Sequence, residues 1–201
     1  ENRLTANGAI YRIDWDDMQL VALDQTTFVR GVRNVGKARI QGLELEFNYL
    51  VRDDLSLGLN YAFTDATLEE DFVPDVRSGL PTALAGERLP GSSRNNYALF
   101  VDWQWPLTSE LNTAFRVTHR YIGDRVDDLG DDSRDQPLIP SYSLTDLRVS
   151  VEHSNGLTVS VFADNVSNKI AITEIREQGT YFTNYRITRP RTVGLNVGYR
   201  F

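Results

Sequence analysis

The 201-residue chain contains no cysteine and a single methionine. The absence of thiols excludes a disulfide framework, a zinc–thiolate or iron–sulfur site and a cysteine nucleophile. No run of residues approaches the 18 or so apolar positions that a membrane-spanning helix requires. Lysine is also scarce: Lys37 and Lys169 are the only two, so 19 of the 21 basic residues are arginine.

Charge and composition narrow the class of protein further. The net charge is −7, whereas a nucleic-acid-binding domain normally carries a basic face. With 41% hydrophobic residues, the chain is too apolar to be disordered. Its length is about that of one domain. The mean hydropathy of −0.36 is that of an ordinary soluble protein.

A period of two runs along the chain and is clearest at its end. In residues 191–201 one face is apolar and ends in aromatics, while the other is small or polar. The apolar positions are Val193, Leu195, Val197, Tyr199 and Phe201. Such alternation predicts a β-strand. It recurs in seven further stretches, which predicts eight strands in all, near residues 9–15, 43–49, 55–63, 97–105, 111–121, 147–151, 157–163 and 193–201.

Two residues break the alternation. In the first stretch Ala9, Tyr11, Ile13 and Trp15 are taken as the apolar face, although Ile10 then falls on the polar side. Phe100 is the exception in its own stretch. Elsewhere the polar face carries charged residues, which are Glu44, Glu46, Arg116, Arg120, Arg148, Glu152 and Arg200.

The connections fall into two classes by length. Residues 52–54, 106–110 and 153–156 are tight and polar, as hairpin turns are. The others are long, at about 65–95, 122–141 and 168–185, with a shorter one near 20–30. Short turns at one end of a sheet and long loops at the other are typical of outer-membrane barrels.

A soluble β-sandwich also alternates, and three features favour a transmembrane barrel over it. Aromatic residues cluster at the ends of the apolar faces, as they do in the girdles of membrane barrels. Charged residues on the opposite face suit a wet or filled lumen. The strands are also as long as the ~9–11 residues that span a bilayer. A low mean hydropathy then follows, because only every second residue meets lipid.

Four segments carry a resemblance to a known family. They are NVGKARIQGLELEF (34–47), GERLPGSSRNNYAL (86–99), FADNVSNK (162–169) and ITRPRTVGLNVGYRF (187–201). Their order and spacing resemble the C-terminal barrel of TonB-dependent outer-membrane receptors over nearly the whole chain. The resemblance implies an all-β, antiparallel transmembrane β-barrel. Residues 1–201 would supply about eight strands, roughly the last third of a 22-stranded barrel, without the plug domain and the TonB-box.

The resemblance also implies a function and a location. The expectation is an outer-membrane receptor that takes up a scarce nutrient, preferably a ferric siderophore on the frequency of that ligand in the family. Its expected partners are the lipid bilayer and lipopolysaccharide, the protein's own N-terminal plug and remaining strands, the TonB–ExbB–ExbD complex and the barrel-assembly machinery. Val197, Tyr199 and Phe201 resemble the signal that this machinery reads.

The sequence leaves further functions open. Within the family, the ligand could instead be a carbohydrate or cobalamin. Outside it, the chain could form a small, closed eight-stranded structural barrel or a soluble β-sandwich binding module. No GxSxG, HExxH or Walker motif is present, so no enzyme, catalytic residue or cofactor is expected.

Candidate contact residues lie in the long loops and on the predicted lumen wall. Arginine beside aromatic rings suits an anionic, ring-bearing ligand, because guanidinium pairs with carboxylates and stacks on rings. The loop candidates are Phe72, Arg77, Arg88, Arg94, Arg176, Tyr181, Tyr185 and Arg186. Glu44 and Glu46 form a like-charged pair that would favour a cationic partner; in the resembled family such glutamates face arginines of the plug.

Two further groups are expected to be structural. His119 and His153 are 34 residues apart and are interpreted as interfacial polar side chains rather than metal ligands. Six aspartates fall within residues 124–135, yet they lack the spacing of an EF-hand. They are interpreted as a solvated acidic loop, with divalent-cation binding as the alternative.

Overall fold

A single large antiparallel sheet dominates the computed structural model, which describes residues 3–24, 29–34, 36–72, 83–127, 129, 138–178 and 182–201. It has eight strands, as the sequence predicts, in the order β1-β4-β5-β6-β7-β10-β11-β14. Their bounds are Leu4–Trp15 (β1), Ala38–Arg52 (β4), Leu55–Leu68 (β5), Asn95–Pro106 (β6), Leu111–Ile122 (β7), Tyr142–His153 (β10), Leu157–Asp164 (β11) and Thr192–Tyr199 (β14).

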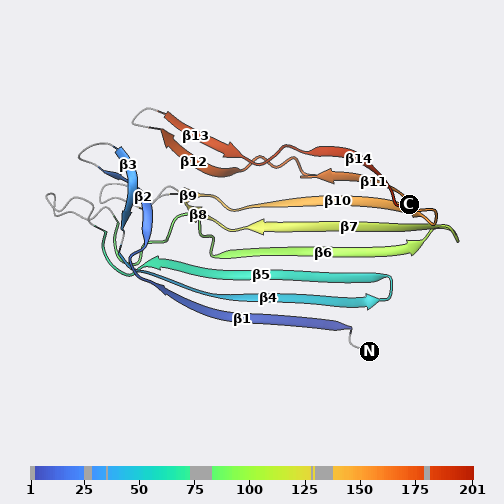
Figure 1. The fold of residues 1–201 in the computed structure, drawn as a ribbon, viewed down its shortest axis with the longest axis horizontal. Helices are drawn as coiled ribbons and strands as arrows, with labels where there is room; N and C mark the ends of the chain where they lie inside the picture. Colours follow the sequence, from blue (N-terminus) through green and yellow to red (C-terminus); the bar gives the residue numbers. More distant parts are fainter. Residues whose placement is uncertain are drawn as a thin grey trace.

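The predicted division of the connections is also confirmed. Short turns join the strands at the right-hand end of Figure 1, and long connections leave them at the left-hand end. The long connections contain three two-stranded sheets, β2–β3 (Gln19–Asp24, Val29–Asn34), β8–β9 (Arg125–Val126, Leu138–Ile139) and β12–β13 (Ile172–Gln178, Phe182–Ile187). The large sheet is open over the described residues, with β1 and β14 as its edges, so these eight strands do not close on themselves.

The strand register sorts the side chains onto two faces. Directly opposed residues on all eight strands form a continuous apolar row: Leu4, Tyr49, Leu57, Val101, Val117, Leu147, Ala163 and Val193. Because side chains alternate along a strand, this row fixes the face of every other residue. We call the face that carries this row the apolar face and the opposite one the polar face.

The register corrects the prediction for the first strand. Ile10 is paired with Leu43 and therefore lies on the apolar face, together with Leu4. Tyr11 is paired with Gly42 and lies on the polar face. The assignment of Ala9, Tyr11, Ile13 and Trp15 to the apolar face was wrong, because three large side chains there outweighed the single Ile10 in the pattern.

Tyr11 belongs to a set of three aromatic rings that cover glycines on the polar face. Each ring lies directly opposite a glycine on the neighbouring strand; the pairs are Tyr11–Gly42, Phe100–Gly58 and Phe162–Gly194. A Cβ atom at any of these glycines would overlap the ring opposite. The Tyr11 hydroxyl also lies 3.1 Å from the Thr64 hydroxyl. Phe100, the second exception to the alternation, therefore occupies space that glycine leaves open.

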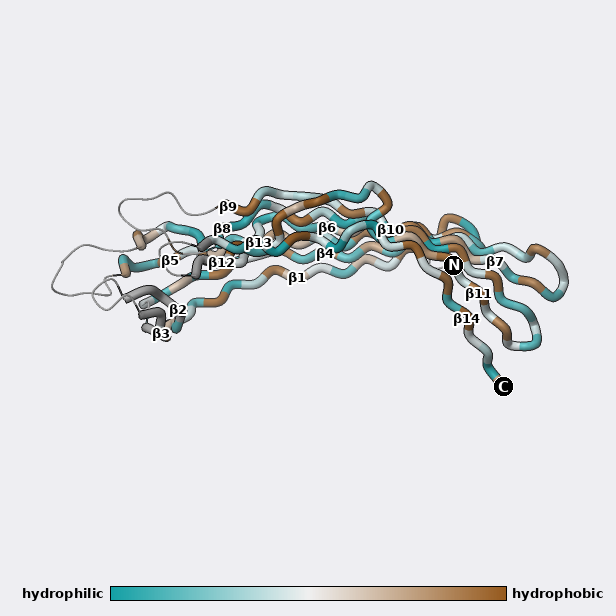
Figure 2. The backbone as a smooth tube through the Cα atoms, turned by 90° about the horizontal axis from the view of Figure 1, so that it is seen from above, coloured by the Kyte–Doolittle hydropathy of each residue, from teal (hydrophilic) through white to brown (hydrophobic). Residues whose placement is uncertain are grey.

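The apolar face has no second layer of protein against it among the described residues. Figure 2 shows the sheet as one curved layer. Large apolar side chains on this face are open, such as Ile10 at 86% and Val193 at 67% exposure. A soluble sandwich would bury such a face against another sheet. An apolar face of this extent marks contact with a membrane or another protein.

A small hydrophobic core lies at the long-connection end, on the polar face. Leu68 and Ala38 are paired across β5 and β4, and both are buried. Met18, Phe72 and Leu89 pack with them from the connections. The long connections therefore fold inward over this end of the sheet.

Asn165 forms a tight turn where β11 ends. Its backbone has a positive φ of 51°, a conformation that asparagine tolerates better than most residues. Asn165 is 4% exposed, and its side-chain amide donates to the carbonyls of Lys169 and Arg189, at 2.9 Å each. The Asn165 carbonyl oxygen Oδ1 accepts from the Lys169 amide at 2.8 Å. One buried side chain thus joins the chain entering β12 to the chain leaving β13.

The apolar residues of the apolar face form a belt that slants across the strands. On β4 the belt runs from Leu43 to Tyr49, and on β14 from Val193 to Tyr199. Tyr49 and Val193 lie in the same cross-strand row. This row is the last of the belt on β4 and the first on β14, so the belt shifts by six residues toward the short turns between these strands. Six residues span about 20 Å and six strand spacings about 29 Å. The strands are therefore tilted by roughly 35° from the normal of the belt.

Substituting Gly58 tests whether the aromatic covers stabilise the sheet. In the complete protein, Gly58→Ala should lower the unfolding free energy by about 1–3 kcal/mol, because the added methyl displaces the Phe100 ring. Denaturant unfolding provides the measurement. Gly198→Ala is the matched control, since a Cβ there meets nothing within 4 Å. Equal unfolding free energies for the two variants would contradict a role for the ring.

Candidate functional site

A shallow groove of about 760 Å³ lies on the polar face. It spans β1, β4, β5, β6 and β7, and its lining includes Glu44, Glu46, Asn60, Asn96 and Arg120. All five occupy polar-face positions of their strands. The sequence prediction that Glu44 and Glu46 share the polar face is therefore confirmed, whereas Asn60 and Asn96 were not singled out. Strand register alone identifies them.

The two glutamates differ in their partners. Glu46 accepts hydrogen bonds from the side-chain amides of Asn7 and Asn48, each at 3.1 Å. Glu44 is exposed and has neither a hydrogen bond nor an ion pair within the part of the chain that the structure describes. Two neighbouring carboxylates without a cation leave this part of the groove uncompensated in charge.

The arginines on the other side of the polar face are mostly paired. Arg116 lies 2.5 Å from Asp102, and Arg120 lies 2.6 Å from Asp146. Arg148 instead lies over the Phe162 ring, 5.7 Å from its centroid. The polar face is therefore acidic at β4, whereas at β7 and β10 acidic and basic side chains balance, with Glu152 as a further carboxylate on β10.

Arg88 ties two long connections together. Residues 86–94 run back along the end of β5, with the amide of Leu68 bonded to the Glu87 carbonyl and that of Leu89 bonded to the Ala66 carbonyl, each at 2.9 Å. The Arg88 guanidinium crosses to Asp124 and donates to its carboxylate and its backbone carbonyl, each at 2.7 Å. Its side chain is only 17% exposed. This contact holds the pKa of Asp124 below its ordinary value, chiefly through the hydrogen bond from Arg88.

Further hydrogen bonds between neighbouring connections continue toward β12. The backbone amide of Gly91 donates to the Val126 carbonyl at 2.9 Å. Arg125 donates to the Thr173 carbonyl, and the Asp127 carboxylate accepts from the Ile175 amide at 3.1 Å. Laterally bonded connections thus extend the wall of the sheet past the ends of its strands. Asp124 and Asp127 have partners here; the aspartates at 128, 131, 132 and 135 lie outside the described residues.

The predicted ligand-contact residues occupy different environments. Phe72 is 6% exposed and packs in the core at the long-connection end. Arg94 pairs with Asp65 at 3.0 Å. On β13, Tyr185 is 57% exposed, and Arg186 pairs with Glu174 at 2.8 Å while remaining open. Arg77, Tyr181 and the side chain of Arg176 lie outside what the structure describes. Of the eight residues, Arg94, Tyr185 and Arg186 are exposed in the part of the chain that the structure describes.

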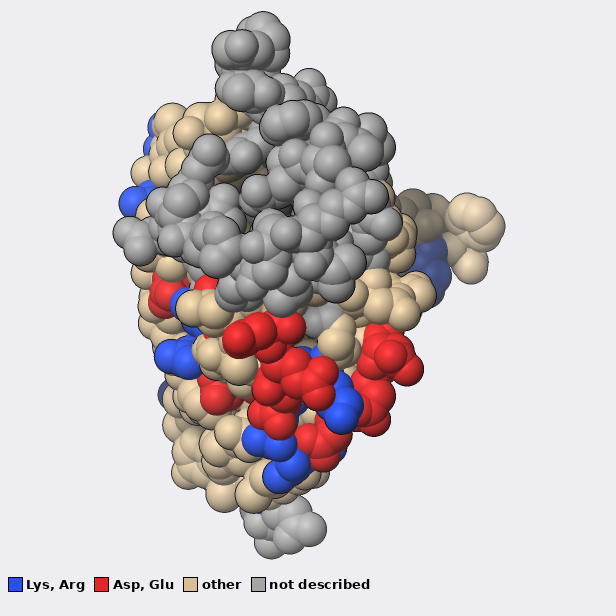
Figure 3. All heavy atoms as spheres, turned by 90° about the vertical axis from the view of Figure 1, so that its left-hand side faces the viewer, with Lys and Arg blue, Asp and Glu red and all other residues tan. Residues whose placement is uncertain are grey.

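A mixed-charge cluster covers the β1–β5 side of the same end. Figure 3 shows acidic and basic side chains gathered below the long connections. Arg39 bridges Asp14 at 3.2 Å and Glu69 at 2.5 Å. Lys37 pairs with Glu70 at 3.3 Å, which raises the pKa of Lys37. The charges are neutralised within the cluster, which therefore resembles a solvated surface more than a binding site.

The C-terminal residues and the histidines lie on the apolar face. Val197 is 60% exposed, Tyr199 58% and Phe201 fully exposed, and the last two rings lie 6.1 Å apart. His119 is bonded through Nδ1 to the Thr145 hydroxyl at 2.9 Å. His153 Nδ1 accepts from the Asn155 amide at 3.0 Å. Both histidines therefore have local polar partners on a face otherwise lined by apolar side chains.

No group of three or more His, Cys, Asp or Glu is placed to hold a metal ion within the residues that the structure describes. Nor does the described part of the chain contain a helix long and apolar enough to cross a membrane.

Comparison with known proteins identifies a family. The model of the "TonB dependent receptor-like, beta-barrel" family matches residues 1–166. Three similar solved structures are the ferric yersiniabactin uptake receptor FyuA from Yersinia pestis, the ferric citrate transporter FecA and the copper transporter OprC. Their TM-scores are 0.75, 0.72 and 0.72, at 21%, 18% and 16% sequence identity. At such identities the likeness shows the fold alone.

The matches differ greatly in how much of each chain they cover. They span 98%, 100% and 100% of this chain. The same alignments cover only 27%, 29% and 30% of the three solved chains. The residues therefore correspond to somewhat more than a quarter of each solved protein.

Removing the Arg88–Asp124 contact should loosen the connection it holds. The lowered pKa of Asp124 means that its stabilising effect is complete above the ordinary value of 3.8 and is lost as the pH falls through the lower folded value. Asp124→Asn should therefore reduce hydrogen-exchange protection of residues 86–94 near neutral pH. The wild type should show the same loss only in acid, after correction for intrinsic exchange rates. Unchanged hydrogen-exchange protection of residues 86–94 in the variant would show that the Arg88–Asp124 contact does not hold this connection.

Proposed function

Because the chain belongs to the TonB-dependent receptor β-barrel family, which matches residues 1–166, we propose that it forms part of the wall of an outer-membrane receptor for nutrient uptake. The slanted apolar belt supports the membrane location. Its roughly 35° tilt equals that of strands in transmembrane barrels, 35–45°. Lipid then covers the apolar side chains that no protein layer covers among the described residues.

Aromatic residues at both borders of the belt support the same location. Tyr97 and Tyr121 stack with centroids 5.0 Å apart near the long-connection border, where Tyr61 also lies. Trp103 and Trp105 lie at the short-turn border, with centroids 4.5 Å apart. Amphipathic rings prefer the two membrane interfaces. The long connections then face outward from the cell and the short turns face the periplasm, as in barrels of this kind.

The open sheet supports a larger barrel. Unpaired strand edges such as those of β1 and β14 are not tolerated in lipid, because their backbone groups have no partner there. The complete receptor therefore supplies further strands, to a total of 22 in this proposal, together with an N-terminal plug and a TonB-box. Uptake is then driven through the plug by the TonB–ExbB–ExbD complex, and the chain transports rather than catalyses.

A ferric siderophore is the ligand that we propose first. Two of the three similar structures are named for iron-containing ligands and the third for copper, so the ligand class differs among proteins of this fold. Arg186 and Tyr185 on the β12–β13 hairpin are open, and together they suit an anionic ligand with aromatic groups. Carbohydrate, cobalamin and copper are the competing ligands.

Uptake by the complete receptor distinguishes these ligands. Cells that lack the gene should lose accumulation of radioactive iron supplied with a panel of siderophores, and the restored gene should return it. Tyr185→Ala/Arg186→Gln should reduce this uptake, whereas Lys37→Gln, a charge change at the opposite side of the mouth, should not. Normal iron uptake in the deletion strain, with loss of copper, cobalamin or sugar uptake, would replace the siderophore by that ligand.

Glu44 and Glu46 are proposed to face basic side chains of the plug. Their charges have no cationic partner within the described residues, and a guanidinium in front of β4 would neutralise them. Glu44→Gln/Glu46→Gln in the complete receptor should lower the unfolding temperature of the plug and change ligand transport. Glu152→Gln, also on the polar face but near the short turns, is the control. Unchanged plug stability and transport in the double variant would reject this contact.

A further inference from the structure

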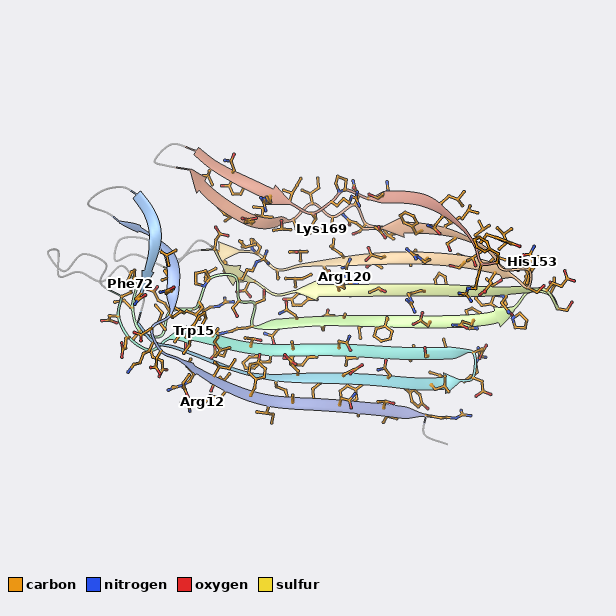
Figure 4. All side chains as sticks on the ribbon, viewed as in Figure 1. Arg12, Trp15, Phe72, Arg120, His153 and Lys169 are labelled. Carbon is orange, nitrogen blue, oxygen red and sulfur yellow. The ribbon has the colours of Figure 1, made fainter. Side chains whose placement is uncertain are left out.

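Three exposed basic residues surround the Asn165 turn: Lys169, Arg189 and Arg191. We call them the cationic patch. Asn165 donates to the backbone carbonyls of the first two, and the Asn168 side chain accepts from the Arg191 amide at 2.9 Å. Thr188, also buried, donates to the Lys169 carbonyl at 2.6 Å. The backbone positions of the three cations are therefore fixed relative to one another before any partner arrives. Figure 4 places Lys169 where the β12–β13 hairpin leaves the large sheet.

The cationic patch lacks a counter-charge. None of its three side chains forms an ion pair with any residue that the structure describes, and the guanidinium of Arg191 makes only a 3.4 Å hydrogen bond to the Val166 carbonyl. Most other arginines whose side chains the structure describes are paired with carboxylates. The nearby Asp146 is occupied by Arg120 and by the Asn165 amide. Like charges held together raise the free energy unless an anion joins them.

The distance of the cationic patch from the border of the apolar belt indicates which class of anion it binds. Val193 is the last apolar belt residue on β14, and Arg191 precedes it by two residues on the same strand path. Two extended residues rise about 7 Å. This distance matches the roughly 5–7 Å headgroup layer on each side of the hydrocarbon core. On the long-connection side, that layer belongs to the outer leaflet.

We propose that the cationic patch binds the phosphorylated headgroup of an outer-leaflet lipid. Guanidinium groups pair with phosphate oxygens in a bidentate manner, and lysine adds a point charge. Long basic side chains also reach along apolar surface into the headgroup layer. Below the patch, Val193 and Leu195 are 67% and 65% exposed and would contact the acyl chains of the same lipid. The apolar contact distinguishes a lipid from a free anion. This inference rests on the proposed membrane location.

Native mass spectrometry of the complete receptor tests the proposal. The probes are phosphatidic acid and phosphatidylcholine with identical acyl chains. The wild type should retain phosphatidic acid preferentially. Lys169→Gln/Arg189→Gln should weaken its binding roughly 25-fold, since one basic residue near an anionic lipid surface contributes about fivefold. Both proteins must show the heat-modifiable gel band of a folded barrel.

The control removes two basic charges elsewhere. Arg148 and Arg200 lie on the polar face and form no ion pair with described residues, so Arg148→Gln/Arg200→Gln should retain phosphatidic acid like the wild type. Equal retention in all three proteins would overturn the proposal. Displacement of the lipid by inorganic phosphate would also overturn it and assign the cationic patch to a free anion. Neither result affects ligand uptake, so a failure here is distinct from a failure of the proposed receptor function.

Discussion

The cross-strand register is the constraint on which the rest of this structure depends. In an antiparallel ladder a shift of one residue exchanges the two faces of a strand. The row from Leu4 to Val193 keeps all eight strands in phase, and it thereby separates the side chains of the apolar face from those of the polar face. Glu44 stands in the groove, and Arg191 next to the apolar belt, only because this phase is kept across the sheet.

The three glycine–aromatic pairs are a second consequence of that phase. Glycine alone packs poorly in a strand, and a large ring on a polar wall is costly unless it covers something. Setting Phe100 against Gly58 and Phe162 against Gly194 resolves both problems, because each ring fills the space of a missing side chain. Arg148 lies over the Phe162 ring, whereas Glu44 is exposed on the same face. The sheet can therefore present a defined set of charges on its polar face.

The sequence was sufficient for the eight strands, the short turns and most of the faces, because alternation repeats over eight or more residues. It failed at the first strand, where Tyr11 looks like a lipid-facing residue until its partner Gly42 is known. It did not foresee the strand pairs within the long connections, whose strands are only two to seven residues long. Nor did it foresee the contact between Arg88 and Asp124, which are 36 positions apart with no periodicity to link them. Exposure of Tyr185 and Arg186 likewise depends on how the hairpin leaves the sheet.

The Asn165 turn has a mechanical consequence for the β12–β13 hairpin. Both chains that lead into the hairpin are held by one buried amide, at the carbonyls of Lys169 and Arg189. Neither chain can slide past the other at this point without breaking two hydrogen bonds in a site shielded from water. The two strands of the hairpin are therefore joined at their base, and a displacement of one chain at this point is passed to the other, which carries Tyr185 and Arg186.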